Sequence, residues 1–206
     1  MIYCADDYIE KYQASISYII EKAITLNFSL SFIERTIAYS QPFSELERSN
    51  VTLIAFDDSE RLFKNIFKDY DRRAILNNDT IYSWLAFVYI HLFLKFKVTF
   101  EMLFIALPIE KALSLFHLYH EIDITQVEKA FVNAINPSNL SCVMNNKKVS
   151  TKQLSNMTGI PFATIRSLKY GYRSLDKFEA NKLVSIAFAL NVKVETLLSS
   201  IPLNTD

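Results

Sequence analysis

Glycine is scarce in this sequence: only two occur among 206 residues, where average usage is about 7%. Tight β-hairpin turns favour glycine, so its absence from the first 158 residues argues against a fold built on hairpins. The two glycines, Gly159 and Gly171, each follow a segment with helical apolar spacing. A left-handed residue commonly ends a helix at such a place, and we expect both glycines at positive φ.

Cysteine and the common catalytic motifs are equally scarce. Cys4 and Cys142 lie far apart and outside any CxxC or Cys/His spacing, which argues against a disulfide framework and structural zinc and fits a reducing, cytoplasmic compartment. His117 and His120, with Glu121 beside them, have metal-ligand spacing, but packing is the favoured interpretation of so small a cluster. The sequence also lacks a phosphate-cradling glycine loop, an HExxH motif and a nucleophile elbow. We therefore expect no enzymatic activity, no cofactor and no metal.

No apolar run is long enough to span a membrane, which takes about 20 residues. The longest one, residues 81–94, is followed by Lys95 and Lys97. The acidic N-terminus also lacks the basic and apolar segments of a secretory signal. We expect no membrane association, and a helix within a soluble core that keeps four large side chains mostly buried: Tyr82, Trp84, Phe87 and Leu94.

What the sequence has in abundance is apolar surface, since 50% of its residues are hydrophobic and 14% are aromatic. In residues 1–137 the apolar spacing is helical, and Leu107-Pro108 predicts a break before a helix over Ile109–Tyr119. One face of a first helix is marked by Tyr8, Tyr12, Ile16, Ile19, Ile20, Ala23 and Ile24. Capping-box spacings predict further helix starts at Ser31/Glu34, Ser44/Glu47 and Thr125/Glu128. The predicted fold class is all-α.

The net charge of zero hides a division of the chain. Residues 1–137 carry 13 Lys and Arg against 18 Asp and Glu, whereas residues 138–206 carry 9 against 4. Six basic residues fall in 27 consecutive positions without any Asp or Glu: Lys147, Lys148, Lys152, Arg166, Lys169 and Arg173. Such asymmetry suggests that the C-terminal part faces a polyanion. We place a boundary at Asn136-Pro137-Ser138, between an N-terminal domain of residues 1–137 and a C-terminal domain of residues 138–206.

A motif in the basic region carries a family resemblance. Residues 151–170 read Thr-Lys-Gln-Leu-Ser-Asn-Met-Thr-Gly-Ile-Pro-Phe-Ala-Thr-Ile-Arg-Ser-Leu-Lys-Tyr, and this segment resembles the Cro/repressor-type (xenobiotic-response-element-like) helix-turn-helix family. Ser155 takes the place of the small residue where the two helices cross, and Gly159 that of the left-handed turn. The apolar positions that pack the helix pair are matched by Leu154, Ile160, Ile165 and Leu168.

The resemblance extends over about 60 residues and implies a five-helix unit over residues 139–198. Residues 169–173 resemble the family's basic turn, and residues 191–198 its final short helix. The loop before the fourth helix is about three residues longer than usual, and we expect Asp176 with Glu179 to cap that helix. Its apolar face is Leu183, Ile186, Ala187 and Leu190.

The resemblance also implies which side chains meet DNA. In this family the second helix of the pair enters the major groove with its N-terminal residues. Here Pro161, Phe162 and Ala163 cannot hydrogen-bond a base, although Phe162 and Ala163 can contact thymine methyl groups. The remaining outward candidates are Thr164, Arg166 and Ser167, with phosphate contacts expected from Thr151, Lys152, Gln153, Lys169, Tyr170, Tyr172 and Arg173.

The predicted function is that of a transcriptional regulator, a repressor that binds duplex DNA sequence-specifically as a homodimer. Residues 1–137 would hold the dimer, sense a ligand or bind a protein partner. The alternative is a protein-capturing module, such as an antitoxin or a phage-encoded inhibitor, whose helix-turn-helix domain regulates its own promoter. The acidic charge of residues 1–137 would suit capture of a nucleic-acid-binding protein.

Overall fold

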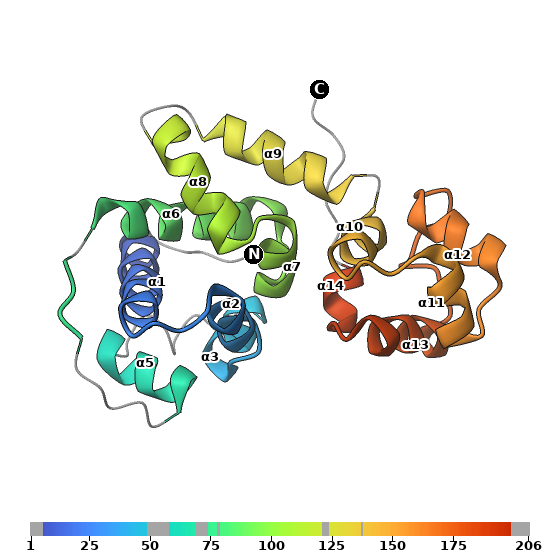
Figure 1. Ribbon diagram of the computed structural model, residues 1–206, viewed down its shortest axis with the longest axis horizontal. Helices are drawn as coiled ribbons and strands as arrows, with labels where there is room; N and C mark the ends of the chain where they lie inside the picture. The colour runs from blue at the N-terminus through green and yellow to red at the C-terminus, as the bar shows by residue number, and fades with distance from the viewer. Residues whose placement is uncertain are drawn as a thin grey trace.

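The computed structural model describes residues 6–48, 58–68, 74–77, 79–120, 124–136 and 138–198. Within these ranges the regular secondary structure is helical, with no strand, which confirms the predicted all-α class. The N-terminal part consists of α1 (Asp6–Thr25), α2 (Leu30–Ala38), α3 (Gln41–Glu47), α5 (Ser59–Phe67), α6 (Thr80–Phe96), α7 (Phe100–Ala106), α8 (Ile109–Tyr119) and α9 (Thr125–Ile135). The C-terminal part consists of α10 (Asn139–Asn146), α11 (Thr151–Thr158), α12 (Phe162–Lys169), α13 (Ala180–Leu190) and α14 (Val194–Leu198), as Figure 1 shows.

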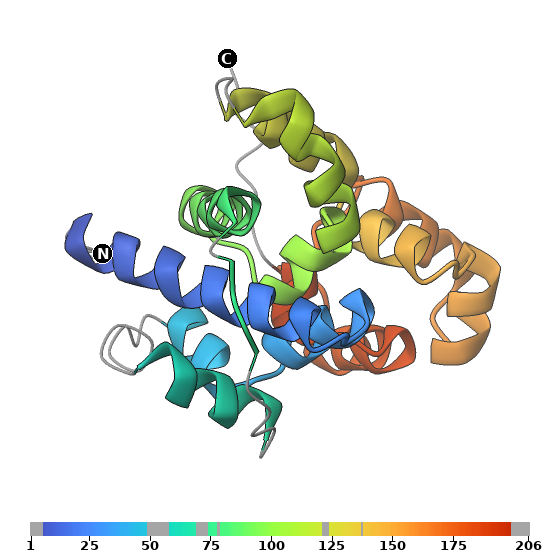
Figure 2. The ribbon, with the colours of Figure 1, turned by 60° about the vertical axis from the view of Figure 1, so that its left-hand side comes forward.

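Helix α1 organises the N-terminal core by packing against α6 and α5 (Figures 1 and 2). The predicted apolar face of this helix is confirmed where it is described: Ile24 is half-buried, and the side chain of Tyr8 lies outside the described residues. The fully buried members are Tyr12, Ile16, Ile19, Ile20 and Ala23.

The predicted break before Pro108 is confirmed, since α7 ends at Ala106 and α8 spans Ile109–Tyr119. The buried Tyr89 of α6 donates a hydrogen bond from its hydroxyl to the carbonyl oxygen of Leu107 at 2.9 Å. Proline and its neighbour interrupt the helical hydrogen bonds at this point, and the tyrosine supplies the partner that the freed carbonyl needs.

The capping boxes predicted at Ser31/Glu34 and Ser44/Glu47 are wrong, whereas the helix start predicted at Thr125/Glu128 is confirmed. Helix α2 begins after Ser29, whose hydroxyl accepts the N–H of Phe32, so Ser31 lies inside the helix. Helix α3 begins after Ser40, which places Ser44 in its middle. Helix α9 does begin at Thr125, but its N-cap residue makes no side-chain capping bond.

The glutamates of those three pairs bind other helices instead. Glu34 Oε1 accepts the first N–H of α8 at 2.7 Å, and Glu47 Oε1 accepts the first N–H of α7 at 2.7 Å. Glu128 accepts a bond from Lys95 Nζ at 2.6 Å and pairs with His91, both on α6. Glu34 and Glu47 thus cap helix starts and Glu128 forms an ion pair. The partner of each glutamate lies on a different helix from the glutamate itself.

Helix α6 is more exposed than the sequence predicts. Phe87 is 39% exposed, which contradicts the expected burial, while Tyr82, Trp84 and Leu94 are half-buried. The helices that pack most closely against α6 are α1, α8 and α7, and they leave Phe87 exposed, so an apolar sequence does not imply burial on every side of a helix. Among the described residues, no helix combines the length and apolarity needed to cross a membrane.

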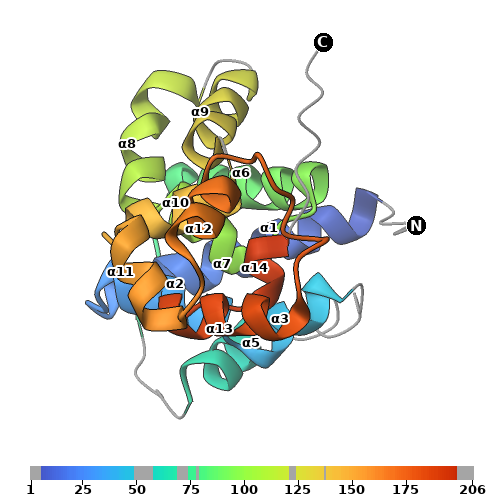
Figure 3. The same ribbon diagram turned by 90° about the vertical axis from the view of Figure 1, so that its right-hand side faces the viewer.

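The C-terminal part is joined to the N-terminal part through α10, which packs against α7 and α9 and also carries α14 (Figure 3). Pro137 of the predicted boundary lies outside the described residues. Ser138 caps α10 by accepting the N–H of Ser141. The buried faces of α10 and α14 thereby form a seam between the two parts.

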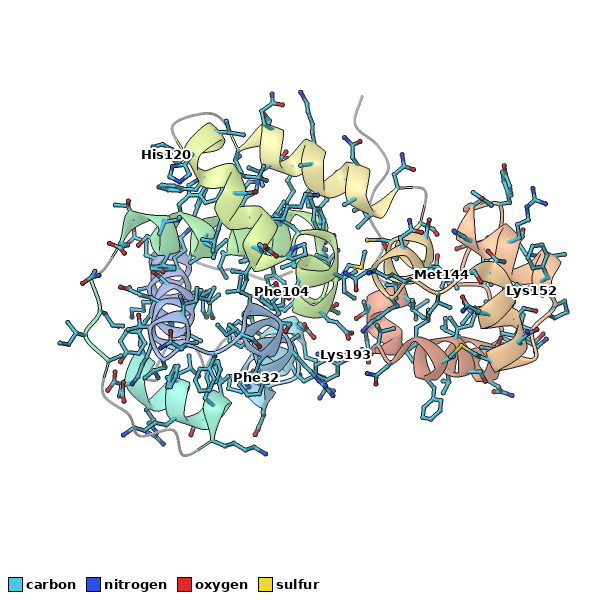
Figure 4. The ribbon with its side chains drawn as sticks, viewed as in Figure 1. Phe32, Phe104, His120, Met144, Lys152 and Lys193 are labelled. Carbon is cyan, nitrogen blue, oxygen red and sulfur yellow. The ribbon has the colours of Figure 1, made fainter. Side chains whose placement is uncertain are left out.

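Buried polar groups hold this seam. Glu101 of α7 is 6% exposed, and its Oε2 accepts the N–H of Lys193 at 2.9 Å and the hydroxyl of Thr196 at 2.7 Å. Its Oε1 accepts the hydroxyl of Tyr39. Lys193 Nζ donates to the last carbonyl of α2 at 2.6 Å and lies 3.3 Å from a carboxylate oxygen of Glu47, and Figure 4 labels it between α2 and α14. These bonds fix the orientation of α14 against the N-terminal part.

Candidate nucleic-acid interface

Three small residues build the turn between α11 and α12. Gly159 has φ 69° and ends α11 in the left-handed conformation, as predicted. Ser155, at the predicted crossing point, donates its hydroxyl to the carbonyl oxygen of Ile160 at 2.6 Å. Thr158 donates to the carbonyl of Leu154 at 2.7 Å and accepts the N–H of Ile160 at 3.3 Å. The turn is therefore fixed by side-chain bonds as well as by glycine.

The start of α11 is a capping box that the sequence analysis missed. Ser150 accepts the N–H of Gln153 at 3.2 Å, and Gln153 Oε1 accepts the N–H of Ser150 at 2.8 Å. The serine and the glutamine three residues later were the available signal. Thr151 and Lys152 occupy the first turn, and the exposed Lys152 points away from the N-terminal part in Figure 4. Because Gln153 Oε1 is used for capping, its amide NH₂ is the group that remains for a phosphate.

Helix α12 has one buried and one exposed face. Ile165 and Leu168 are fully buried against α10 and α11. Phe162 is 50% exposed at the first turn, Arg166 is exposed, and Thr164 and Ser167 are half-buried. The outward face thus combines an aromatic tip with a guanidinium group, the pairing that the resemblance implies for base contacts.

The segment after α12 carries the remaining candidates. Ser138 donates to the carbonyl of Lys169 at 2.8 Å, which ties the end of α12 to α10. Gly171 has φ 71°, as predicted. Lys169 Nζ lies 5.9 Å from the ring centroid of Tyr170, and that ring lies 6.2 Å from the ring of Tyr172, which is 81% exposed. Arg173 is exposed beside them.

The predicted cap of the fourth helix is wrong. Helix α13 begins at Ala180, and its N-cap residue Glu179 makes no side-chain capping bond. Glu179 accepts a bond from Lys182 at 2.7 Å instead, and Asp176 accepts one from Ser174 at 2.9 Å. The apolar face of α13 is confirmed, with Leu183, Ile186, Ala187 and Leu190 all buried.

The candidate side chains gather at one end of the molecule. In Figure 1, α11 and α12 lie together at the end of the molecule opposite α1 and α5, and this end faces the viewer in Figure 3. No Asp or Glu occurs from Lys147 to Arg173, so the candidate cations of this stretch have no acidic neighbour along the chain. Within the ranges that the structure describes, no group of three or more His, Cys, Asp or Glu side chains has a metal-binding arrangement.

A short helix, a left-handed turn and a second helix with an exposed basic and aromatic face define a helix-turn-helix DNA-binding unit. Residues 139–202 match the model of the family described as the Cro/C1-type HTH DNA-binding domain, which confirms the resemblance for the C-terminal third of the chain. No curated protein and no solved structure matches the chain.

Proposed function

We propose that this protein is a transcriptional regulator that binds duplex DNA sequence-specifically and represses transcription as a homodimer. The match of residues 139–202 to a DNA-binding domain supports duplex DNA as the ligand. The observation that carries the proposal is the outward face of α12, which presents Phe162 and Arg166 while its opposite face holds the helix on α10 and α11. A side chain must protrude from a rigidly held helix to read a base edge.

The candidate residues divide by role. Lys152 on α11, Lys169 at the end of α12 and Arg173 after it are proposed to contact phosphates, because positive side chains at the edges of a recognition surface meet the DNA backbone. Phe162 and Arg166 are proposed to contact bases. Their neighbours complete the surface: Thr151, Gln153, Thr164, Ser167, Tyr170 and Tyr172.

The proposal is tested by selecting bound sequences from random duplex DNA with the full chain. Lys152→Ala, Lys169→Ala and Arg173→Ala should each weaken binding to all duplexes alike and lower the salt slope by about 1, since one phosphate contact is lost. Lys64→Ala is the matched control, because Lys64 is an exposed lysine on α5 in the N-terminal part. If the control weakens binding as much, the effect is one of net charge and not of this surface.

Base reading is tested separately with the residues of α12. Phe162→Ala and Arg166→Ala should change the preferred sequence, by about 1 to 3 kcal/mol at the affected base pair. An unchanged preference with reduced affinity would mean that α12 does not read sequence. DNA binding unaffected by either set of variants would reject the DNA-binding proposal.

Dimerisation follows from the small number of base contacts that one α12 offers. A second recognition helix on the same DNA raises the effective concentration and places two half-sites about 34 Å apart, or a multiple of it. Two apolar side chains of the N-terminal part are exposed and are candidates for the dimer contact: Phe87 on α6 and Leu118 on α8. Light scattering should give twice the chain mass at micromolar concentration, and a monomer with and without DNA would reject the dimer.

The same exposed apolar side chains also favour the alternative, a module that captures another protein through residues 1–137. The two functions differ in what covers Phe87 and Leu118. Replacing both by serine should dissociate the homodimer if a second copy covers them. If the dimer survives the double substitution, a second copy does not cover Phe87 and Leu118, and this outcome would favour a different protein as the partner of this surface.

A further inference from the structure

A cavity of about 260 Å³ lies in the seam between the two parts of the protein. One wall comes from α2 and α7, together with Pro108 before α8. The other wall comes from the ends of α10 and α13, at Asn146, Lys147 and Asn191. Phe104, labelled on α7 in Figure 4, is one of the lining residues. The cavity thus lies between residues of both parts.

The cavity is lined by charges of both signs. Arg35 of α2 and Lys147 after α10 line opposite walls, and neither forms an ion pair with a residue that the structure describes. Both are exposed at the surface, so their charges are available to a ligand entering from solvent. Two cations that line one cavity without an ion-pair partner among the described residues attract a carboxylate or a similar anion.

The carboxylates of the cavity differ in how far they are already used. Glu101 accepts hydrogen bonds from three donors of the seam. Glu34 uses Oε1 for the first N–H of α8 at 2.7 Å, and partial burial raises its pKa despite that bond. Among the described residues the other oxygen, Oε2, accepts no hydrogen bond, and Glu34 lines the cavity. Glu34 therefore offers Oε2 to a cationic group.

Part of the cavity wall is apolar. Phe104 and Ala38 are almost fully buried and Ile105 is half-buried, so they form a surface that water solvates poorly. Pockets for drug-sized molecules hold about 300 to 1,000 Å³, so 260 Å³ suits a smaller metabolite. The ligand that fits is small and carries an anion, a cation and an apolar group.

We propose that this cavity binds a free α-amino acid with an apolar side chain. Arg35 and Lys147 hold its carboxylate, Glu34 holds its ammonium group, and its side chain packs on Phe104 and Ile105. A simple anion would bring its charge beside the two carboxylates, and a simple cation would bring its charge beside Arg35 and Lys147. The zwitterion matches both. This site does not depend on DNA binding, because none of these residues belongs to α11 or α12.

Isothermal titration calorimetry of the full chain with leucine, valine, methionine and phenylalanine tests the proposal. At least one of them should bind, and two analogues of the amino acid that binds separate its charges: the deaminated acid lacks the ammonium group and the decarboxylated amine lacks the carboxylate, as isocaproate and isoamylamine do for leucine. Both analogues should bind at least about tenfold more weakly than the parent amino acid, since each loses a charge-assisted contact. Absence of binding by all four amino acids, or equal binding of the parent amino acid and either analogue, would overturn the proposal.

Variants then assign the two ends of the ligand. Arg35→Ala and Lys147→Ala should each weaken amino-acid binding about tenfold or more, and Glu34→Gln should do the same while its amide oxygen still accepts the N–H of α8. Both cations are exposed, so their truncation leaves the core intact. Lys182→Ala, an exposed lysine on α13 outside the cavity, is the matched control. Binding that is unchanged in the three variants, or lost in the control, would refute this site.

Discussion

Replacing Gly159 isolates the physical cost of the turn between α11 and α12. Gly159 has φ +69°, and an added Cβ would find no atom within 4 Å. The cost of Gly159→Ala is therefore that of the left-handed backbone alone, about 1 to 2 kcal/mol. Gly159→Asn should cost less, because asparagine tolerates this conformation. Gly159→Val should cost a few kcal/mol, since a β-branched side chain tolerates it poorly.

Thermal unfolding followed by circular dichroism measures these differences. For a chain of this length, 1 kcal/mol corresponds to about 2 to 4 °C in Tm, so Gly159→Ala should lower Tm by about 2 to 8 °C. The expected order of stability is Gly, Asn, Ala, Val. A valine variant as stable as the wild type, or an alanine variant less stable than the valine variant, would refute the assignment of the cost to backbone conformation.

Three further predictions concern single side chains. Burial acts to raise the pKa of Glu128, but hydrogen bonds from two side chains of α6 outweigh this effect and lower that pKa. The ionised Glu128 therefore stabilises the fold at pH values above its pKa in the unfolded chain, which is near 4.3. This stabilisation is lost as the pH falls through the lower pKa of the folded state. Glu128→Gln should therefore cost about 1 to 3 kcal/mol at pH 7 in urea titrations and flatten the acid dependence, whereas an unchanged pH profile would contradict it. Lys193→Met should destabilise the seam by a similar amount, because it removes the cation that pairs with Glu47. Lys182→Met is the control and should have little effect, since Lys182 and Glu179 form an exposed ion pair. Ser150→Ala should cost about 1 kcal/mol through loss of the α11 cap, and a urea midpoint equal to that of the wild type would reject that role.

The recognition unit could be predicted from the sequence because its determinants are local. Gly159 and Gly171 have the expected positive φ, and the Ser155 hydroxyl bonds to the carbonyl oxygen of Ile160 in the turn between the two helices. Left-handed backbone favours glycine, and a close crossing requires a small side chain, whatever the rest of the protein does. The buried residues of α12 and α13 follow likewise from a period of 3.6 residues.

The exposure of the candidate DNA contacts depends on how that unit is held. The sequence identified Phe162 and Arg166 from their positions in α12, and the structure leaves both at its surface. The sequence did not indicate that the side-chain carbonyl oxygen of Gln153 accepts hydrogen bonds from the N–H and the hydroxyl of Ser150. A glutamine near a helix start has the same spacing whether it faces DNA or its own backbone.

The capping glutamates show what only the tertiary structure decided. A serine or threonine three residues before a glutamate predicts a local capping box, yet Glu34 and Glu47 accept the first N–H groups of α8 and α7. The unsatisfied N–H groups at a helix start attract any carboxylate that reaches them. Which carboxylate reaches them depends on which helices pack together, and local spacing carries no information about that.

The sequence by itself determined the all-α class of the described residues, the helix-turn-helix unit of the C-terminal third, and the left-handed conformation of Gly159 and Gly171. These features depend on side chains within a few residues of each other. The tertiary structure alone decided that Glu101 and Lys193 fasten the two parts together and that a cavity opens between them. Residues 92 positions apart meet there, because burying the apolar faces of α7, α10 and α14 brings those two side chains together, and a buried charge must find a partner wherever the fold provides one.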